Sequence, residues 1–345
     1  MKFLDTTSEY IFFKKEIDSI VNKTAMSGKY LLGDNTKSLE SKFNLIVGNE
    51  YSNVAVKNCT DAITMIVKKI WRPNMPIILP NFGAYPTSVA VHAITKNVHY
   101  VDVDKTFTID ADKLPDIKNG IIIPVHLFGN NCDMKKIMDY AKSNNHIVIE
   151  DCAQSTGSGT GNFGHYSVFS FYPTKPLASM GDGGMICTRM GDEEYFRKFR
   201  FYGQLGRNME FVGINSRIDE FQAGIVLSKL SKFHELNEKR KEIACRYSEF
   251  VVGMKPRGNC VYHQFPLLFK NREKVINLMK NLKIPFIIHY EKHVTDFKFL
   301  NDLNYKANFR VSDKILSIPV HPFMREDEIK IVCEFLKEVG KYEIK

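Results

Sequence analysis

The stretch from residue 147 to residue 188 constrains the fold most strongly, because it holds two apolar runs that are each followed by polar, reactive side chains. Residues 147–149 read Ile-Val-Ile, a short β-branched run that predicts a buried strand with Asp151 near its carboxyl end. Residues 166–172 alternate between polar and apolar side chains, which predicts a second strand. Because open α/β sheets hold ligands at the carboxyl ends of their strands, we expect Asp151 and Lys175 to face the same crevice.

Lys175 and Asp151 form a pair with a defined chemistry. A lysine amine can form a Schiff base with pyridoxal 5'-phosphate (PLP), and a carboxylate keeps the pyridine nitrogen of that cofactor protonated. The alternative is an ordinary lysine on a surface loop, which is the commoner situation for any lysine. The aromatic residues at 169, 171 and 172 and the Gly-Asp-Gly-Gly segment 181–184 argue against that alternative, since glycines permit a close approach of the backbone.

The chain of 345 residues is longer than one typical hydrophobic core requires, so two domains are expected. Strands alternate with helices across residues 50–190, which predicts an α/β domain whose mostly parallel sheet is flanked by helices on both faces. A long amphipathic helix is predicted from Ile218 to about Tyr247. After Gly253 a strand is predicted at residues 261–269, a helix at 272–282 and a second strand at 285–289. We therefore predict a large domain at residues 1–235 and a smaller C-terminal α/β domain at residues 236–345.

Composition argues against several classes of protein. With 44% hydrophobic and 25% charged residues the chain is typical of a globular protein, and no apolar run reaches the length of a membrane span. Seven widely spaced cysteines without a C-x-x-C pair, and a start that lacks a signal-peptide core, predict a reduced, cytoplasmic protein. The net charge of +9 suits nucleic acid or anionic small substrates, but basic residues alternate with acidic ones, so a solvated surface is favoured.

A second wall of the crevice is expected where a predicted strand at residues 51–57 is followed by Asn-Cys-Thr-Asp at residues 58–61, the start of a helix. Free N–H groups and the helix dipole favour an anion at such a start, although an ordinary N-cap is the simpler interpretation. Gln154 could be a surface amide or a donor to a phenolic oxygen. Ser170 is expected to face a polar site, because it alternates with apolar neighbours.

Two arrangements of histidine resemble metal ligands only in part. His289 and His293 have the i,i+4 spacing of a metal pair, but they follow a predicted strand and no third ligand is evident, so no metal site is predicted. His126 ends another predicted strand, at residues 121–126, and either lines the crevice or is a buried, hydrogen-bonded histidine.

Six blocks of sequence follow one another along nearly the whole chain: residues 58–62, 125–129, 150–154, 170–175 with 181–184, 213–217 with 222–223, and 289–290. Together they resemble the DegT/DnrJ/EryC1/StrS family of PLP-dependent sugar aminotransferases. That family has the type I PLP-dependent (aspartate aminotransferase) fold, so the resemblance implies this α/β fold, with a large domain and a smaller C-terminal α/β domain. It also implies pyridoxal 5'-phosphate as the cofactor.

The resemblance assigns a role to each block. Lys175 is implied to be the catalytic amine that binds PLP and moves the proton, while Asp151 meets the pyridine nitrogen and Gln154 the phenolic oxygen. The full set of implied cofactor-binding residues is Cys59, Thr60, Tyr85, Asp151, Gln154, Ser170, Lys175 and Asn215. Asn215 is implied to reach the PLP phosphate of the neighbouring subunit, which implies a homodimer with shared active sites.

The sequence departs from the family pattern at the phosphate and at the ring of the cofactor. Asn58 and Cys59 stand where the family usually has serine and glycine, so the phosphate turn is expected to lose a hydroxyl contact. The aromatic residue that covers the PLP ring in the family aligns with the pair Gly83-Ala84. Tyr85 is therefore expected to cover the ring, with Phe82 as the alternative.

The resemblance also implies the reaction and its partners. The chain keeps Lys175 where a dehydrating branch of the family has histidine, so transamination from L-glutamate to a nucleotide-linked keto sugar is implied. The expected substrate is dTDP-4-keto-6-deoxyglucose, converted to its 4-amino derivative and bound near His289 and Tyr290; the alternative is a dTDP-3-keto-6-deoxyhexose. A non-catalytic PLP or sugar-nucleotide sensor and a basic nucleic-acid module are alternatives from other classes. The intact Lys175, Asp151 and Gln154 argue against the sensor.

Overall fold

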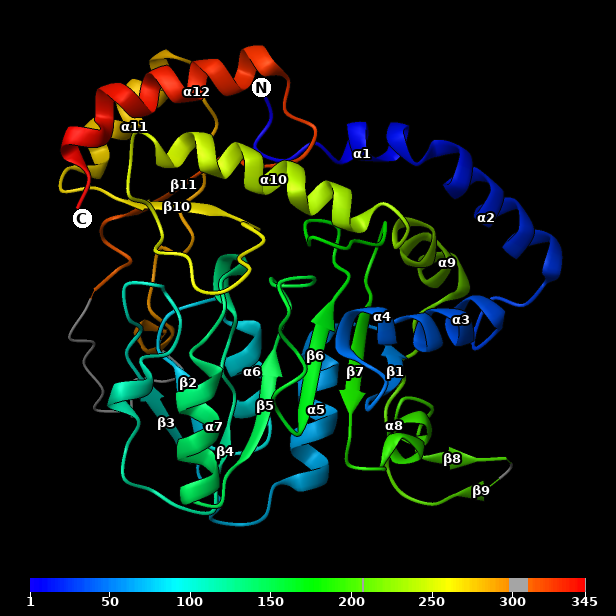
Figure 1. Ribbon diagram of the computed structural model, residues 1–345. Helices are drawn as coiled ribbons and strands as arrows, with labels where there is room; N and C mark the ends of the chain where they lie inside the picture. Colours follow the sequence, from blue (N-terminus) through cyan, green and yellow to red (C-terminus); the bar gives the residue numbers. More distant parts are fainter. Residues whose placement is uncertain (207, 298–309, 345) are drawn as a thin grey trace.

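A seven-stranded sheet forms the centre of the computed structural model, which describes residues 1–206, 208–297 and 310–344 (Figure 1). Its strands are β1 (Ser52–Val56), β2 (Ile77–Pro80), β3 (Val98–Val101), β4 (Ile121–Ile122), β5 (Ile147–Asp151), β6 (Tyr166–Ser170) and β7 (Gly184–Thr188). The spatial order is β1-β7-β6-β5-β4-β2-β3. All neighbours from β3 to β6 pair in parallel, whereas β7 runs antiparallel to both β6 and β1. The predicted, mostly parallel sheet is therefore confirmed.

Helices cover both faces of this sheet, because its strands carry buried apolar side chains at consecutive positions and therefore on both faces. Residues such as Val54, Ile77 and Ile149 pack on one face against α5 (Cys59–Ile70), α6 (Pro86–His92) and α8 (Glu193–Phe199). The opposite face packs against α3 (Asp34–Lys42), α7 (Met134–Ser143) and α9 (Glu220–Lys229). This arrangement places the carboxyl ends of the parallel strands at one edge.

Strand β7 was not anticipated, since residues 181–184 suggested only a glycine-rich connection. Its first residue, Gly184, lies against the start of α5. A Cβ added at Gly184 would lie 2.7 Å from the carbonyl carbon of Asn58 and 2.8 Å from the nitrogen of Cys59, so only glycine fits without a shift. The start of α5 therefore lies directly beside the strand that follows the Lys175 loop.

The single helix expected from Ile218 to Tyr247 is wrong: the chain forms α9 and then α10 (Phe233–Ser248). The last turn of α9 tightens into a 3-10 turn, since the N–H of Leu230 donates to the carbonyl of Leu227, three residues earlier, at 3.4 Å. After this turn the chain changes direction and buries Phe233 in the apolar core that α3 and α9 form with one face of the large sheet. Further helices at the N-terminus are α1 (Thr6–Phe12), α2 (Lys14–Ser27) and α4 (Asn44–Val47).

The C-terminal part has its own small sheet and its own core. β10 (Phe265–Leu268) and β11 (Ile315–Ile318) pair antiparallel, and α10, α11 (Arg272–Asn281) and α12 (Glu326–Val339) bury their apolar faces with them. The strand expected at residues 285–289 is only an isolated bridge between Ile287 and Ser317. The predicted boundary between residues 235 and 236 falls inside α10 and remains a prediction.

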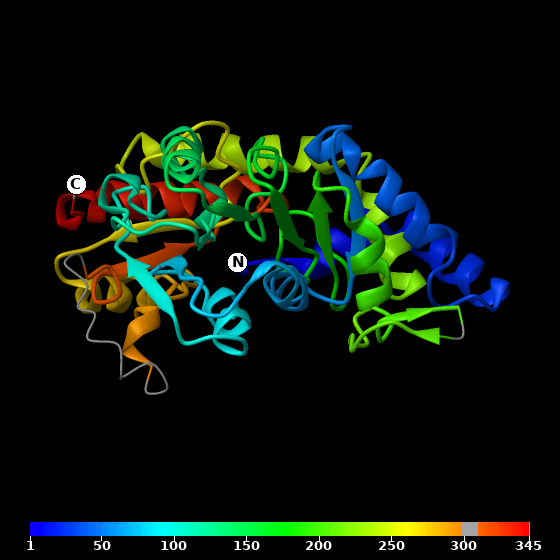
Figure 2. The same ribbon diagram turned by 90° about the horizontal axis from the view of Figure 1, so that it is seen from below.

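Short elements complete the described structure. The hairpin of β8 (Gln204–Leu205) and β9 (Asn208–Met209) lies at the opposite end of the molecule from the C-terminus (Figure 2). The single-turn 3-10 helices are η1 (Ala111–Lys113), η2 (Leu127–Gly129), η3 (Val294–Asp296) and η5 (Gly340–Tyr342). Among the helices of the described residues, none is long and apolar enough to cross a membrane.

Candidate active site

A cavity of about 610 Å³ opens at the carboxyl ends of β5 and β6. It brings together most of the residues predicted for the site, and these are Cys59, Thr60, Tyr85, Asp151, Gln154, Ser170, Lys175 and Tyr290. They come from five separate stretches of the chain, which the sheet and α5 hold around one volume. His289 and Asn215 do not line this cavity in the single chain.

Lys175 lies in the turn that follows β6, where its backbone N–H donates to the carbonyl of Tyr172 at 2.9 Å. Burial lowers the pKa of the Lys175 amine below its ordinary value, and the nearby Asp151 carboxylate and Cys59 oppose that shift. A lysine with a lowered pKa has a larger neutral fraction, which is the nucleophilic form. The side chain lines a cavity, unlike the ordinary surface lysine that was the alternative.

Asp151 ends β5 and is almost fully buried, with hydrogen-bond donors around its carboxylate. The hydroxyl of Thr87 donates to Oδ2 at 2.6 Å, and the backbone N–H of Ala153 donates to Oδ1 at 3.0 Å. The sulfur of Cys59 lies 4.0 Å from Oδ1. These donors fix the orientation of the carboxylate, which lines the cavity and is placed to face a cationic ring.

Gln154 is held by both ends of its amide. Its Oε1 accepts from the backbone N–H of Phe128 at 2.8 Å, and its Nε2 donates to the hydroxyl of Tyr290 at 3.0 Å. Burial raises the pKa of Tyr290 to about 12, so its hydroxyl stays neutral at ordinary pH. The donor end of Gln154 therefore points at the same side of the cavity as Tyr290.

The start of α5 supplies a wall of backbone N–H groups. Asn58 caps the helix, because its side chain accepts from the N–H of Asp61 at 2.7 Å, so the ordinary N-cap interpretation is correct. Cys59 and Thr60 nevertheless line the cavity at the first turn of a 12-residue helix. The N–H groups of a first turn have no partner within the helix and favour an anion such as a phosphate.

The two aromatic candidates for covering a ring occupy different places. Tyr85 is 54% exposed and lines the cavity, while Phe82 is only 1% exposed and does not. The ring of Phe82 packs beneath, with its centroid 5.1 Å from that of His293 and 6.1 Å from that of Tyr290. The geometry therefore favours Tyr85 for covering a ring.

His289 and Asn215 lie outside the cavity and have partners of their own. Nδ1 of His289 lies 3.1 Å from the hydroxyl of Ser317, and burial together with the charge of Lys175 lowers its pKa to about 4. Asn215 is exposed, and its Oδ1 accepts from Nε of Arg217 at 3.1 Å. An exposed Asn215 is compatible with use by a second subunit, which remains a prediction.

The histidines considered as metal ligands are hydrogen-bonded within the fold. His293 accepts from the N–H of Val311 at 3.1 Å, away from the Ser317 partner of His289. His126, Glu150 and Cys152 are buried and offer ligand atoms within 4.8 Å of one another. However, Glu150 receives His126 Nε2 at 3.0 Å and the backbone N–H groups of residues 161, 163 and 164. His126 is thus the buried, hydrogen-bonded histidine of the two alternatives.

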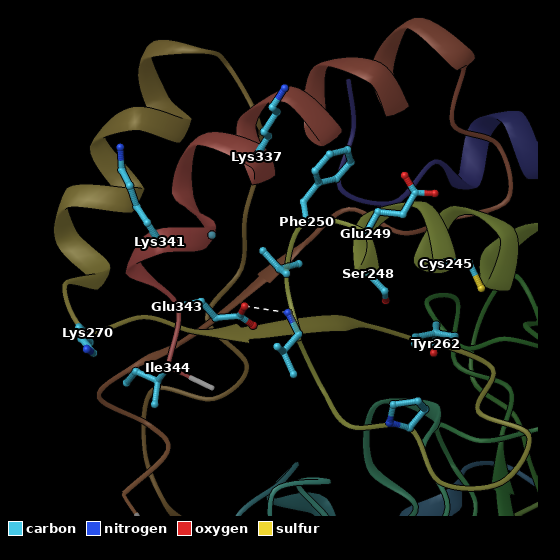
Figure 3. Close-up of a pocket in the computed structure, with 14 residues that line it drawn as sticks. Cys245, Ser248, Glu249, Phe250, Tyr262, Lys270, Lys337, Lys341, Glu343 and Ile344 are labelled. Carbon is cyan, nitrogen blue, oxygen red and sulfur yellow. Dashed lines mark hydrogen bonds between the residues drawn. The ribbon is translucent and has the colours of Figure 1, made fainter.

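A larger cavity, of about 1180 Å³, lies on the C-terminal part between the end of α10 and the end of the chain (Figure 3). Glu343 closes one side of it, because its carboxylate accepts from the N–H groups of Val252 at 2.8 Å and Gly253 at 2.6 Å. No residue predicted for the active site lines this cavity. The reactive pair of Lys175 and Asp151 belongs to the smaller one.

Sequence reasoning missed Thr87, whose hydroxyl makes the shortest contact to Asp151 in the cavity. A signal was present, since a threonine directly after Pro86 opens the helix that follows β2, at the same edge of the sheet as Asp151. It also missed Tyr172 and Thr174, which flank the Lys175 turn and line the cavity.

A lysine and a carboxylate at strand ends, beside a helix start, on a seven-stranded α/β sheet define a PLP-dependent enzyme of the type I fold. The chain belongs to the DegT/DnrJ/EryC1/StrS aminotransferase family, whose family model matches residues 12–337. PLP is the cofactor of this family, and the expected fold, cofactor and enzyme class are confirmed. The residues present fit that cofactor. One cavity holds the amine of Lys175, the carboxylate of Asp151 and, at the start of α5, a site suited to a phosphate.

Relatives of known activity share most of the chain. It is 30% identical to the UDP-2-acetamido-2-deoxy-3-oxo-D-glucuronate aminotransferase of Pseudomonas aeruginosa, over 97% of this chain and 99% of the relative. It is 31% identical to the dTDP-3-amino-3,6-dideoxy-alpha-D-galactopyranose transaminase of Aneurinibacillus thermoaerophilus, over 98% and 99%. A solved aminotransferase of this family from Brucella abortus superposes with a TM-score of 0.89 at 26% identity, and covers 99% of both chains.

Proposed function

We propose that this protein transfers an amino group from an amino acid to a nucleotide-linked keto sugar. The observation that carries the proposal is the single cavity in which Lys175 and Asp151 meet beside the start of α5. When bound, PLP supplies an electron-accepting ring that stabilises negative charge on the carbon next to the transferred amine. The remaining chemistry belongs to side chains of this chain.

Lys175 moves the proton in this proposal. Its amine would hold the cofactor until the amino-acid donor takes its place. The freed amine then takes the proton from the α-carbon of the donor, and later delivers a proton to the sugar carbon that receives the amine. Asp151 holds the proton on the ring nitrogen, and Gln154 donates to the phenolic oxygen. The first turn of α5, at Cys59 and Thr60, binds the phosphate.

The keto group is proposed to lie at C3 of the sugar. Both named relatives above carry a 3-oxo or 3-amino sugar in their descriptions, one linked to UDP and the other to dTDP. The 4-keto sugar dTDP-4-keto-6-deoxyglucose, expected from the sequence, remains the second candidate, and it rests on the family resemblance. L-glutamate is the proposed donor, and His289 with Tyr290 the proposed sugar contacts.

The test is a matrix of donors and acceptors. Purified protein with PLP is incubated with L-glutamate and with UDP- or dTDP-linked sugars that carry a keto group at C3 or at C4, and amino sugar and 2-oxoglutarate are measured by mass spectrometry. With the 3-keto compounds, amino sugar and 2-oxoglutarate are expected to form in equal amounts. Amination of the 4-keto compounds alone would overturn the C3 assignment.

The matched control separates binding from turnover. The Lys175→Ala variant removes the amine but leaves the rest of the cavity wall in place, so it is expected to form neither product. If the wild-type protein binds PLP but aminates none of the sugars, the non-catalytic sensor becomes the better description.

A further inference from the structure

Donors are distributed unequally over the two oxygens of Asp151. Oδ1 accepts from the N–H of Ala153 at 3.0 Å and faces the thiol of Cys59 at 4.0 Å, while Oδ2 accepts, among the described residues, only from the hydroxyl of Thr87 at 2.6 Å. A carboxylate offers about four acceptor positions, two on each oxygen. Three are taken, so the position that is left open lies on Oδ2.

We propose that Thr87 and Cys59 are positioning residues for Asp151, and that they leave the second acceptor position of Oδ2 for the ring N–H of the cofactor. This inference rests on the proposed role of Asp151 toward PLP. It goes further by assigning the orientation of the carboxylate to two side chains from α5 and α6, which approach it from different elements.

Thr87 is a donor in this contact by necessity. An ionised carboxylate only accepts hydrogen bonds, so the proton between Thr87 and Asp151 comes from the hydroxyl. Both side chains are buried, at 6% and 3% exposure, so water does not compete for the bond. Hydrogen bonds to a charged group are shorter and stronger than those between neutral groups, which agrees with the distance of 2.6 Å.

Cys59 adds a weaker donor at the position where the family usually has glycine. Burial and the negative charge of Asp151 raise the pKa of the Cys59 thiol well above its ordinary value, so it keeps its proton. A protonated thiol can donate to Oδ1, whereas a thiolate would repel the carboxylate. Cys59, one of the departures from the family pattern, therefore acts on the carboxylate that faces the ring nitrogen as well as at the phosphate turn.

The experiment reads the ring nitrogen directly. PLP labelled with ¹⁵N in its ring is bound to the wild type and to Thr87→Val, Thr87→Ser, Cys59→Ala and Cys59→Ser, and the nitrogen chemical shift is measured by NMR. The dissociation constant of PLP is measured by absorbance titration. Ser88→Ala is the control, because the Ser88 hydroxyl bonds to that of Tyr100 and not to Asp151.

Thr87→Val is expected to move the shift toward unprotonated pyridine and to weaken PLP binding about 10-fold, the effect of one hydrogen bond to a charged group. Thr87→Ser keeps the hydroxyl donor and Cys59→Ser replaces the thiol donor by a hydroxyl, so both variants are expected to retain the protonated ring. Cys59→Ala is expected to shift the signal in the same direction as Thr87→Val, by less. Ser88→Ala is expected to match the wild type.

An unchanged shift and affinity in Thr87→Val overturn the proposal. If that variant does not fold, as judged by circular dichroism, Cys59→Ala decides, because the family's glycine shows that the position tolerates a small residue; an unchanged shift there is then the contrary result. If the wild-type protein itself binds no PLP, the failure lies with the proposed function and not with this inference.

Discussion

Replacing Gly184 with alanine perturbs the phosphate end of the site through one backbone contact. The new Cβ would lie 2.7 Å from the carbonyl carbon of Asn58 and 2.8 Å from the nitrogen of Cys59, where ordinary contact begins at 3.4 Å. Neither backbone atom can rotate away. The start of α5 must therefore move by about 0.6 to 0.7 Å relative to β7 to restore contact.

Such a shift has two expected effects. Overpacking of a buried contact costs about 1–3 kcal/mol in the free energy of unfolding, which urea denaturation measures. The displaced N–H groups of Cys59 and Thr60 are expected to weaken PLP binding about 10-fold, as measured by absorbance titration. A misplacement near 1 Å costs up to about 100-fold in rate, so kcat is expected to fall by about 10- to 100-fold.

Gly191 provides a control that separates a loss of stability from a displacement of the phosphate site. Gly191 has a φ of +68°, and a Cβ there would meet nothing within 4 Å. In Gly191→Ala the free energy of unfolding is therefore expected to fall by about 1–2 kcal/mol, because of the left-handed backbone alone. The affinity for PLP is expected to stay unchanged. Wild-type affinity in Gly184→Ala would refute the reasoning that this contact fixes the phosphate site.

Three further predictions address the subunit, the amine and the buried carboxylate. Lys175→Ala and Asn215→Ala are each expected to be nearly inactive, but an exchanged 1:1 mixture should recover about a quarter of wild-type activity, because half of the dimers are mixed and each then has one intact site; an assay that finds no recovery contradicts the shared site. In the protein without cofactor, burial holds the pKa of Lys175 below 10.5, the value in the unfolded chain. The charged amine therefore destabilises the folded protein below its folded pKa, and this destabilisation disappears as pH rises toward 10.5. Lys175→Met should raise the free energy of unfolding at pH 7 by an amount that shrinks toward pH 10.5, and a gain independent of pH would be the contrary outcome. In Glu150→Gln an amide N–H₂ replaces one carboxylate oxygen, so it faces donors such as His126 and the N–H of Gly161 that need an acceptor. The free energy of unfolding, measured by urea denaturation, is expected to fall by about 3–5 kcal/mol. A fall of less than about 1 kcal/mol would show that the His126 contact matters little.

The sequence allowed the reactive pair to be placed because both residues follow strands. Asp151 ends β5 and Lys175 follows β6, and two parallel neighbours bring their carboxyl ends to one edge whatever the loops do. The same logic located the start of α5. Local patterns of apolar residues were therefore sufficient for the fold class and for the centre of the cavity.

Contacts between distant residues were beyond the reach of local patterns. The Thr87 to Asp151 bond joins residues 64 positions apart, and the place of Thr87 at a helix start after β2 indicates the right edge of the sheet but does not identify Asp151 as its partner. The break between α9 and α10 depends on where Phe233 finds its core, since periodicity continues across the break. The partner of His289 is Ser317 of β11, and the local pattern of residues around His289 does not identify it.

The pairing of β1 with β7 determines when the phosphate wall of the site can first be held in place during synthesis. β1 lies at the edge of the sheet, and Val56 pairs with Gly184, which the ribosome adds long after Val56, shortly after Lys175 and after all the parallel strands β2 to β6. Until then α5 follows a strand without its neighbour, and such long-range pairing is slow to form. A nascent chain therefore gains the ability to retain its cofactor late, after most of its parallel strands are already present.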